Sequence, residues 1–537
     1  MKNGDSSITE LMQEAATCFN AGDLPGAQLA CERLIEIEPG HPDALNVLAV
    51  IARANKKWGR AEEIAKEAFA VNPNSARLAN TLGLIFLDQR RLNEAIESFE
   101  TAIGLNDQHS GYLSNLGSAL QADAQWETAK DAFSRALVID PIFRAALIGR
   151  ASVATDMGVF AEAVADLALA KKSGPPDPAV ETGFAKLFLA QGNLDAAYKA
   201  FDAAVALTEH VADAKVNRGL IRMMQGRIQD GWEDYASRRW RRWSRSASRY
   251  SHLHPWKGEN LAGKSILIWC EQGLGEAILC ASLINKLTAE AGRVTVEVDA
   301  RLVSLFERSF PAVEVVAQGT EAIDEDNSID IQAPIFELIG YRSSNALTQA
   351  PGAAFLWPDE DQKEAFAMEY RALGGDNPLV GISWGSPAAA TARQKSLPID
   401  IFEPILRIPD VTFVNLQYGP ARHEIAGIAQ SVGANLITDS TIDLDGSLDS
   451  PAAQIAALDL VITVTNSTAH LAGALGKETW VLVPPLGLGS MWYWFTDIDK
   501  SPWYESVTLM RRTLGADTQF MSQVTRRLKA WVDRRSK

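Results

Sequence analysis

Leu460-Val-Ile-Thr-Val-Thr-Asn-Ser-Thr-Ala-His-Leu-Ala-Gly-Ala-Leu-Gly476 joins a short apolar run to a polar hinge and a helix-forming segment. Residues 460–464 are apolar and mostly β-branched, which predicts a buried parallel strand. Residues 469–475 are rich in strong helix formers, and Gly476 stands where a left-handed helix stop is expected. The sequence therefore predicts a strand that turns directly into a helix.

The hinge between these two elements consists of Thr465, Asn466, Ser467 and Thr468, which are residues that cap helix N-termini. A strand that passes straight into a helix directs free backbone N–H groups, and the positive end of the helix dipole, toward the C-terminal edge of the sheet. The hinge is therefore a candidate anion site. The alternative is an ordinary turn in which asparagine and serine only cap the helix.

The composition is that of a long globular chain. Its 537 residues predict about three or four units, because one hydrophobic core rarely serves so long a chain. With 22% charged and 47% hydrophobic residues it is not typical of disorder, and no apolar run predicts a membrane span. Residues 1–10 are polar and lack the apolar core of a secretion signal, so the cytoplasm is the predicted location. The net charge of −16 argues against general nucleic-acid binding.

Metal sites and disulfides are not indicated. The chain has four cysteines, at Cys18, Cys31, Cys270 and Cys280. They form no C-x-x-C pair and have no histidine at zinc-ligand spacing, so we expect buried thiols. Asp443-Leu-Asp445 and Asp497-Ile-Asp499 match a metal-binding D-x-D pattern, but two matches are expected by chance in so acidic a chain.

The first half of the chain repeats with a period of 34 residues. Alanine recurs at this spacing at Ala27, Ala61, Ala95, Ala129, Ala163 and Ala197. Small residues recur at Ala15, Ala49, Gly83, Gly117, Ala151, Ala185 and Gly219, and again at Ala68, Ala102, Ala136, Ala170 and Ala204. Proline closes units at Pro39, Pro73, Pro141 and Pro175. Small residues let two helices cross closely, and proline ends the second helix. Aromatic residues fill the space beside the crossing, at Phe99, Phe133, Phe201 and Tyr235.

This pattern resembles the tetratricopeptide repeat over about residues 8–245. Such repeats stack into a superhelix whose concave groove commonly binds an extended segment of another protein, although the array could also serve as a rigid spacer. Asn46 and Asn80 share one register while Asn115 and Asn217 fall one residue later. A continuous asparagine ladder along the groove is therefore not predicted.

The repeat array ends in a basic segment, Arg238-Arg-Trp-Arg-Arg-Trp-Ser-Arg-Ser-Ala-Ser-Arg249. Six arginines interleaved with Trp240 and Trp243 could stack on and neutralise a nucleic acid. The simpler interpretation is a helix end whose tryptophans seat the repeats on the next domain, followed by a linker at residues 246–262. We therefore expect no nucleic-acid partner.

The second half of the chain changes period. Short apolar runs alternate with helical stretches, and the runs cover residues 265–270, 294–298, 313–316, 329–331, 379–384, 412–416, 436–438, 460–464 and 479–483. This alternation, present twice over, predicts two doubly wound α/β halves at residues 263–374 and 375–537 that face each other across a cleft. Ligands of such sheets bind at the carboxyl ends of the strands, which the hinges at residues 272–276 and 465–468 follow.

Four motifs resemble those of bacterial tetratricopeptide glycosyltransferases, which are similar to heptosyltransferases and, more distantly, to protein O-GlcNAc transferases. They are Glu271-Gln-Gly-Leu-Gly-Glu276, Val414-Asn-Leu-Gln-Tyr-Gly419, Asn466-Ser-Thr-Ala-His-Leu-Ala-Gly-Ala-Leu-Gly476 and Ser501-Pro-Trp-Tyr504. The resemblance implies a GT-B fold with a nucleotide-activated sugar bound by the C-terminal half and an acceptor bound by the N-terminal half. It also implies no obligatory metal and no cofactor beyond the nucleotide-sugar co-substrate. Two departures are Glu276, where the family usually has aspartate, and Gly385, where relatives often have arginine.

Glycosyl transfer requires that the departing phosphate be neutralised. For this task we expect the hinge at residues 465–468, together with Lys395 as a mobile positive charge and Arg393 as second choice. The similar lysine of heptosyltransferases lies in the same loop. His470 lies in the first helical turn, where the dipole disfavours its charged form, so it is either a neutral hydrogen-bond donor to the nucleotide or a core histidine.

The acceptor hydroxyl must also lose its proton, and Glu276 is the candidate base, carried over from the family's aspartate. A carboxylate just inside a helix start is also favoured by capping alone, which is the alternative. Gly273 and Gly275 would let the acceptor-side loop approach a ligand closely, or simply permit the turn.

The predicted function is a metal-independent glycosyltransferase that transfers a sugar to Ser or Thr hydroxyls of a protein acceptor selected by the repeats. Relatives that modify flagellin make flagellin a candidate acceptor. The alternatives are a protein-binding scaffold with an inactive transferase half, and a transferase directed at lipopolysaccharide or another glycan.

Overall fold

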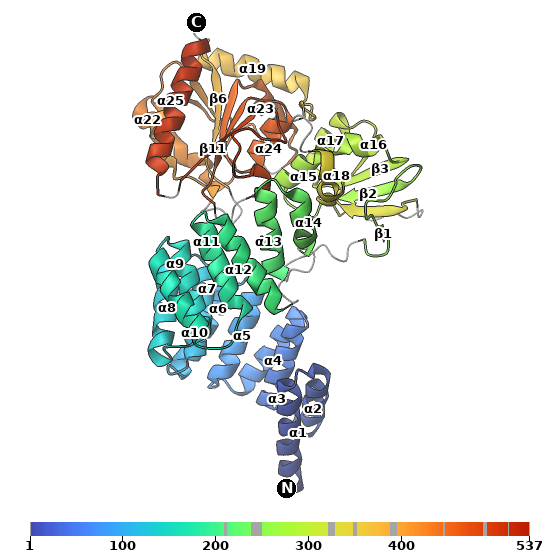
Figure 1. The fold of residues 1–537 in the computed structure, drawn as a ribbon, viewed down its shortest axis with the longest axis vertical. Coiled ribbons are helices and arrows are strands. Elements are labelled where there is room, and N and C mark those ends of the chain that lie inside the picture. The colour runs from blue at the N-terminus through green and yellow to red at the C-terminus, as the bar shows by residue number, and fades with distance from the viewer. Residues whose placement is uncertain are drawn as a thin grey trace. The chain divides into compact units, whose positions relative to one another are not determined.

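The computed structural model describes residues 2–208, 212–237, 250–319, 328–346, 352–386, 395–443, 446–486, 491–513 and 515–535. These fall into two compact units, Met1–Thr208 and Glu209–Lys537. Figure 1 shows the first unit as stacked helices and the second as helices and strands. Within the described ranges, no helix combines the length and hydropathy needed to cross a lipid bilayer.

Helices of the first unit follow one another in pairs joined by short turns (Figure 1). In order they are α1 (Lys2–Asn20), α2 (Leu24–Ile37), α3 (Pro42–Ala54), α4 (Trp58–Val71), α5 (Ala76–Asp88), α6 (Leu92–Leu105), α7 (Ser110–Ala122), α8 (Trp126–Ile139), α9 (Arg144–Asp156), α10 (Phe160–Lys172), α11 (Pro178–Ala190) and α12 (Leu194–Leu207). The six alanines spaced 34 residues apart are fully buried.

Close helix crossing explains the small residues of the repeat. A Cβ atom at Gly83 would lie 2.5 Å from the ring of Phe99, and one at Gly117 would lie 2.9 Å from the ring of Phe133. Both distances are shorter than a van der Waals contact, so a larger residue would push the two helices of a pair apart. The predicted combination of a small residue and a facing aromatic ring is therefore confirmed in these repeats.

A further periodic feature is the turn inside each helix pair. One residue per repeat, again spaced 34 apart, has a left-handed backbone, at Gly22, Lys56, Arg90, Ala124, Gly158, Gly192 and Gly226. Glycine adopts this conformation without steric cost, whereas a residue with a Cβ atom is strained by about 1 kcal/mol. Three of the turns thus hold a residue that the backbone disfavours.

Replacing Ala124 by glycine is expected to raise the free energy of unfolding of the first unit by about 0.5–1 kcal/mol, because the strained residue is relieved. Gly158→Ala is the matched control: it is equally exposed, has no heavy atom within 4 Å of an added Cβ, and should lose stability by a similar amount. Urea unfolding followed by helical circular dichroism measures both. Midpoints that coincide for the two variants would contradict this account of the turn.

The second unit begins with α13 (Ala212–Met224) and α14 (Ile228–Ala236), which continue the 34-residue phase. They nevertheless pack into the α/β part, because Trp232 and Tyr235 lie in its core and the Trp232 Nε1–H donates to Glu337 Oε2 at 3.3 Å. The division between units therefore lies at residues 208 and 209, ahead of the expected linker at 246–262.

Most of that expected linker belongs to the second unit. Residues 250–262 are described and contribute the buried Leu253, Trp256 and Leu261 and the short strand β1 (His254–Pro255). The basic segment with Trp240 and Trp243 lies outside the described residues. Among the cysteines, Cys31, Cys270 and Cys280 are buried and Cys18 is partly exposed.

The first sheet is parallel and has, among the described residues, the order β1-β5-β2-β3-β4. Its other strands are β2 (Ser265–Trp269), β3 (Arg293–Val298), β4 (Glu314–Ala317) and β5 (Ile331–Pro334). The helices that follow its strands are α15 (Leu274–Ala281), α16 (Ile284–Thr288), η2 (Ala300–Leu302), α17 (Val303–Ser309) and α18 (Glu337–Ala346).

The second sheet is also parallel, with the order β11-β10-β9-β6-β7-β8 in the described part of the chain. Its strands are β6 (Leu379–Ser383), β7 (Thr412–Asn415), β8 (Asn435–Ile437), β9 (Leu460–Val464), β10 (Thr479–Val483) and β11 (Val507–Arg511). Its helices are α19 (Glu360–Gly374), η3 (Ile399–Phe402), α21 (Glu403–Leu406), η4 (Pro420–His423), α22 (Glu424–Val432), α23 (Asp449–Ala457), α24 (Ser467–Ala474), η5 (Trp492–Trp494) and α25 (Asp517–Arg535).

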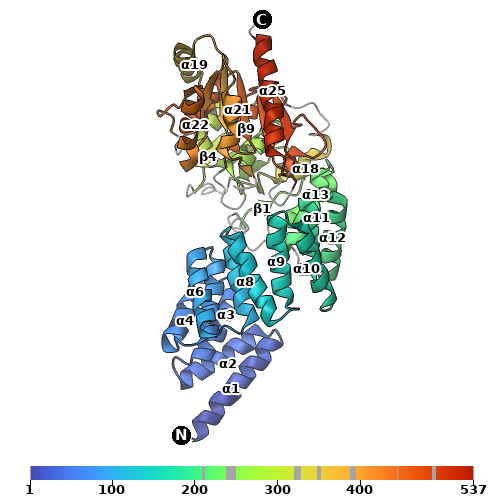
Figure 2. The same ribbon diagram turned by 90° about the vertical axis from the view of Figure 1, so that its left-hand side faces the viewer.

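Helices cover both faces of the second sheet. Figure 2 shows α25 and α19 on opposite sides of it. The apolar face of α25 packs with β6, β9 and β10, while α19 packs against α23. Because the central strands are covered on both faces, β6, β9 and β10 are buried along their whole length, which explains their continuous apolar sequences. The helix at residues 360–374 thus packs with the second sheet, although the expected boundary between halves was at residue 375.

Candidate functional site

The turn from β9 to α24 forms as the sequence predicts, but its asparagine does not cap the helix. Asn466 is the N-cap residue and makes no side-chain capping bond. Its amide instead donates to Ser383 Oγ at 2.8 Å and to the Gly385 carbonyl at 3.0 Å, and its oxygen accepts from Thr463 Oγ1 at 3.0 Å. The alternative of a capping asparagine is therefore wrong. Asn466 ties the end of β9 to the end of β6.

Gln417 fixes the neighbouring strand ends in the same way. Its Oε1 accepts from the backbone N–H groups of Trp384 and Gly385 at 3.0 and 2.8 Å. A Cβ atom at Gly385 would lie 3.2 Å from Gln417 Nε2, so this side chain crowds a larger residue there. Glycine at this position, a departure from the resembled family, therefore accompanies the glutamine that holds β6 and β7 together.

Lys395 stands at the end of a segment whose ends are held together. Ser386 N–H donates to Ser396 Oγ at 3.0 Å, and Leu397 N–H donates to the Trp384 carbonyl at 2.9 Å. Lys395 is only 8% exposed, and its amine has no hydrogen bond or ion pair with any residue that the structure describes. Burial lowers the pKa of Lys395, although the charge of Glu276 opposes this shift. Arg393 lies outside the described residues.

Glu276 lies in the first turn of α15, as predicted. Its Oε1 accepts a hydrogen bond from the Tyr493 hydroxyl at 2.9 Å. Gly273 is the N-cap residue and has an ordinary backbone, whereas a Cβ atom at Gly275 would lie 2.7 Å from His470 Cδ2. The close approach that Gly275 permits is thus between α15 and α24.

His470 is buried between aromatic rings. Its Nδ1 lies 2.9 Å from the Tyr504 hydroxyl, and its ring stacks on Trp494 with the centroids 5.0 Å apart. Burial, together with the nearby positive charge of Lys395, lowers the pKa of His470 to about 3. The histidine is therefore neutral at working pH, as expected, although burial is the first cause of this.

These side chains line one cavity of about 360 Å³, which we call the polar pocket. Its lining residues are Leu274, Gly275, Glu276, Arg301, Ser386, Lys395, Tyr418, Thr465, Asn466, Ser467, His470 and Tyr493. Segments that follow strands β2, β3, β6, β7 and β9 contribute to it, so it lies at the carboxyl ends of strands from both sheets. Both predicted hinges reach this pocket.

A smaller space of about 70 Å³, which we call the apolar recess, shares part of this lining. The shared residues are Leu274, Arg301, Tyr418 and Ser467. Its remaining lining is mostly aliphatic: Ile278, Leu416, Leu448, Pro451, Gln454, Ile455, Thr468 and Leu471. Thr468, expected beside the phosphate, thus faces the recess.

The polar pocket suits an anionic ligand. Lys395 and Arg301 bring positive charge, Glu276 alone among the described lining residues brings negative charge, and His470 is neutral. Arg301 pairs with Asp299 at 2.9 Å. Thr465 Oγ1 is buried and has no hydrogen-bond partner in the described part of the chain, which is costly unless a ligand supplies one. The pocket thus combines a partnerless ammonium, an unsatisfied hydroxyl and a helix start with a carboxylate.

Five lining residues were absent from the predicted site residues, and one of them, Leu274, lies inside the predicted hinge at residues 272–276. Tyr418 lies inside one of the quoted motifs, so the motif could have indicated it. Its hydroxyl accepts from Ser467 Oγ at 3.1 Å. Arg301, Ser386 and Tyr493 stand in no recognisable pattern, and only the tertiary fold brings them to the pocket.

Tetratricopeptide repeat models match residues 19–85, 76–109 and 182–238. The chain is therefore a tetratricopeptide repeat protein with a second unit built on two parallel sheets. Protein FlbA of Caulobacter vibrioides is 30% identical over 514 residues, which cover 90% of this chain and 78% of FlbA. The chain belongs to the FlbA family.

Two further similarities cover less of the chain. Superkiller protein 3 of Schizosaccharomyces pombe is 23% identical over 152 residues, covering 27% of this chain and 11% of that protein. A solved tetratricopeptide repeat protein from Parabacteroides merdae is 19% identical, with a TM-score of 0.38, and covers 43% of this chain and 91% of its own.

Proposed function

We propose that this chain is a glycosyltransferase of the GT-B type, which transfers a sugar from a nucleotide-sugar donor to Ser or Thr hydroxyls of a protein acceptor. The observation that best supports the proposal is the Lys395 amine, which is nearly buried, lines the polar pocket and has no partner among the described residues. A buried ammonium is costly without a counter-charge, and a diphosphate supplies one.

The donor's phosphates would bind between Lys395 and the start of α24. When the bond from the sugar to the leaving phosphate breaks, negative charge grows on the phosphate oxygen. The Lys395 ammonium and the Thr465 hydroxyl, which has no partner among the described residues, would stabilise that charge. The neutral ring of His470 would border the same space without adding charge.

The proton of the acceptor hydroxyl would pass to Glu276, which lines the same pocket from α15. A carboxylate within hydrogen-bond reach of the acceptor hydroxyl provides general base catalysis, and the acceptor oxygen then bonds to the sugar carbon as the bond to the phosphate breaks. The proposal includes no cofactor and no obligatory metal, as the resemblance implies, and a cytoplasmic location.

The repeats would select the acceptor, since stacked repeats present an extended surface to partner proteins. Polar side chains link neighbouring repeats, for example Asn115 Nδ2, which donates to Asn80 Oδ1 at 2.7 Å. Flagellin is the first acceptor to test, on the strength of the family resemblance described above.

The test is calorimetric titration of the full chain with UDP-, ADP-, GDP-, TDP- and CMP-sugars, followed by capture of the acceptor. We expect one donor class to bind both the full chain and a shorter chain beginning at Glu209, because the pocket lies wholly in the second unit. Only the full chain should capture the acceptor. Starting at Leu253 instead would remove Trp232 and Tyr235 from the core.

Failure of all five donor classes to bind would favour a scaffold with an inactive transferase half. Equal capture of the acceptor by both chains would show that the repeats do not select the acceptor.

A further inference from the structure

Tyr493 connects the two sheets at the candidate base. It lies in η5, which follows β10 of the second sheet, while Glu276 lies in α15, which follows β2 of the first. The Tyr493 hydroxyl donates to Glu276 Oε1 at 2.9 Å, and both side chains line the polar pocket. Neither composition nor the quoted motifs assign a role to this tyrosine.

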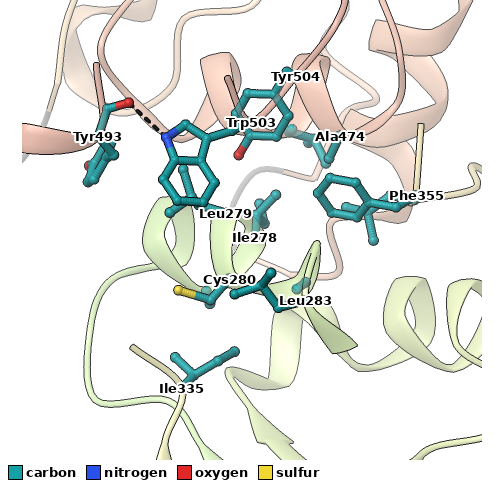
Figure 3. Packing of buried hydrophobic residues seen from close by; sticks show 14 of the residues in the cluster. Ile278, Leu279, Cys280, Leu283, Ile335, Phe355, Ala474, Tyr493, Trp503 and Tyr504 are labelled. Atoms are coloured by element: carbon teal, nitrogen blue, oxygen red, sulfur yellow. Dashed lines mark hydrogen bonds between the residues drawn. The ribbon is translucent and has the colours of Figure 1, made fainter. Parts of the chain in front are cut away.

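The position of Tyr493 is fixed from several sides. Its carbonyl accepts from the Trp503 indole N–H at 2.9 Å, as Figure 3 shows. Its ring packs edge-on against His470 and Trp494, with centroids 5.2 and 5.6 Å apart. A side chain held in this way has one orientation, and its hydroxyl therefore holds the carboxylate in one orientation as well.

Glutamate needs such support more than the family's aspartate does. Its side chain has one more rotatable bond, so an unsupported carboxylate would spread over more positions. The bond from Tyr493 engages Oε1 only, which leaves Oε2 to accept a proton. Burial and the negative charge of Glu276 raise the pKa of Tyr493 well above its ordinary value, so the tyrosine remains a donor at working pH.

We propose that Tyr493 is a positioning residue for the transfer reaction: its hydroxyl orients Glu276 across the cleft so that Oε2 faces the acceptor hydroxyl. The inference rests on the proposed function. It explains how a glutamate can stand in place of the family's aspartate, because the partner on the opposite side fixes the longer side chain.

Tyr493→Phe retains the ring and removes only the donor. We expect kcat to fall by about 10-fold through loss of orientation, with KM for the donor nearly unchanged. Lys395, Arg301, Tyr418, His470 and Tyr504 also face this region, and the variant leaves all of them in place.

Tyr370→Phe is the matched control. The Tyr370 hydroxyl is buried, donates to Asp439 Oδ2 at 2.8 Å and accepts from Gln454 Nε2 at 2.8 Å. The variant therefore loses a bond from tyrosine to carboxylate, and one further bond, without changing a residue that lines the polar pocket. Its thermal midpoint should fall while kcat and KM for the donor keep their wild-type values. If kcat of Tyr493→Phe also equals that of the wild type, Tyr493 is only structural and the proposal is overturned.

An infrared measurement separates this inference from the proposed function. Subtracting the spectrum of Glu276→Gln isolates the Glu276 carboxylate stretch without any need for activity. A shifted carboxylate band in Tyr493→Phe would support the proposal that the Tyr493 hydroxyl orients Glu276. An unshifted band would overturn that proposal. A wild-type chain that transfers no sugar from any donor would instead overturn the proposed function.

Discussion

Replacing Glu276 by glutamine is expected to lower turnover by roughly 10² to 10⁴ while fold and donor affinity are preserved. The amide keeps the shape of the side chain. Its oxygen can still accept the hydrogen bond that the Tyr493 hydroxyl donates to Glu276 Oε1 at 2.9 Å in the wild type. It cannot accept the proton of the acceptor. Steady-state rates and thermal midpoints measured on the same preparations will separate a chemical effect from a structural one.

Glu276→Asp is the control for this prediction. It retains the carboxylate and restores the residue of the resembled family, so it should be tolerated better than glutamine. If Glu276 only stabilises the start of α15, the glutamine variant should lose about 0.3–1 kcal/mol of stability with little change in rate. Similar rates of sugar transfer by the wild type and Glu276→Gln would show that Glu276 is not the general base.

The second large effect is expected at Lys395. Lys395→Ala should lower the rate by on the order of 10²-fold or more, because the nearly buried ammonium would stabilise the leaving phosphate. Burial lowers the pKa of Lys395, so its positive charge is present at low and neutral pH and is lost as pH rises, sooner than for an ordinary lysine. The affinity of the wild type for the nucleotide-sugar donor should therefore weaken as pH rises above neutral. The affinity of Lys395→Ala should not change over the same pH range.

Lys477→Ala provides a matched control for Lys395. Burial also lowers the pKa of Lys477, but its amine donates to the Leu458 carbonyl and does not line the polar pocket. This variant should lose stability while its donor affinity and the pH dependence of that affinity stay unchanged. If both variants had equal donor affinity, Lys395 would not be a phosphate ligand.

Periodicity explains why most of the fold was predictable. Buried parallel strands are continuous apolar runs, and β9 and β10 occupy the predicted residues, 460–464 and 479–483. Two of the edge strands were missed, because β1 has only two residues and β11 is apolar at one end and partly exposed at the other. The opposite edges, β4 and β8, overlap the predicted runs at residues 313–316 and 436–438. The compact units divide at residues 208 and 209, before the repeat pattern ends, because α13 and α14 keep that pattern while packing into the second unit.

The candidate site was predictable only where its residues are local in sequence. The turn at 465–468 and the helix start at Glu276 are strand-to-helix hinges with recognisable composition. The roles of Asn466 and Gln417 depend on other strand ends, and Arg301 and Tyr493 reach the pocket through tertiary packing alone. No local pattern marks a tyrosine that contacts a carboxylate 217 residues earlier in the chain.

Intact mass of acceptor proteins tests the central claim most directly. Flagellin and other proteins captured by the full chain are purified from cells with the chain, without it, and with its Glu276→Gln variant. The account predicts an acceptor whose mass is greater by whole sugar residues only when the wild-type chain is present. Identical acceptor masses in all three would contradict it.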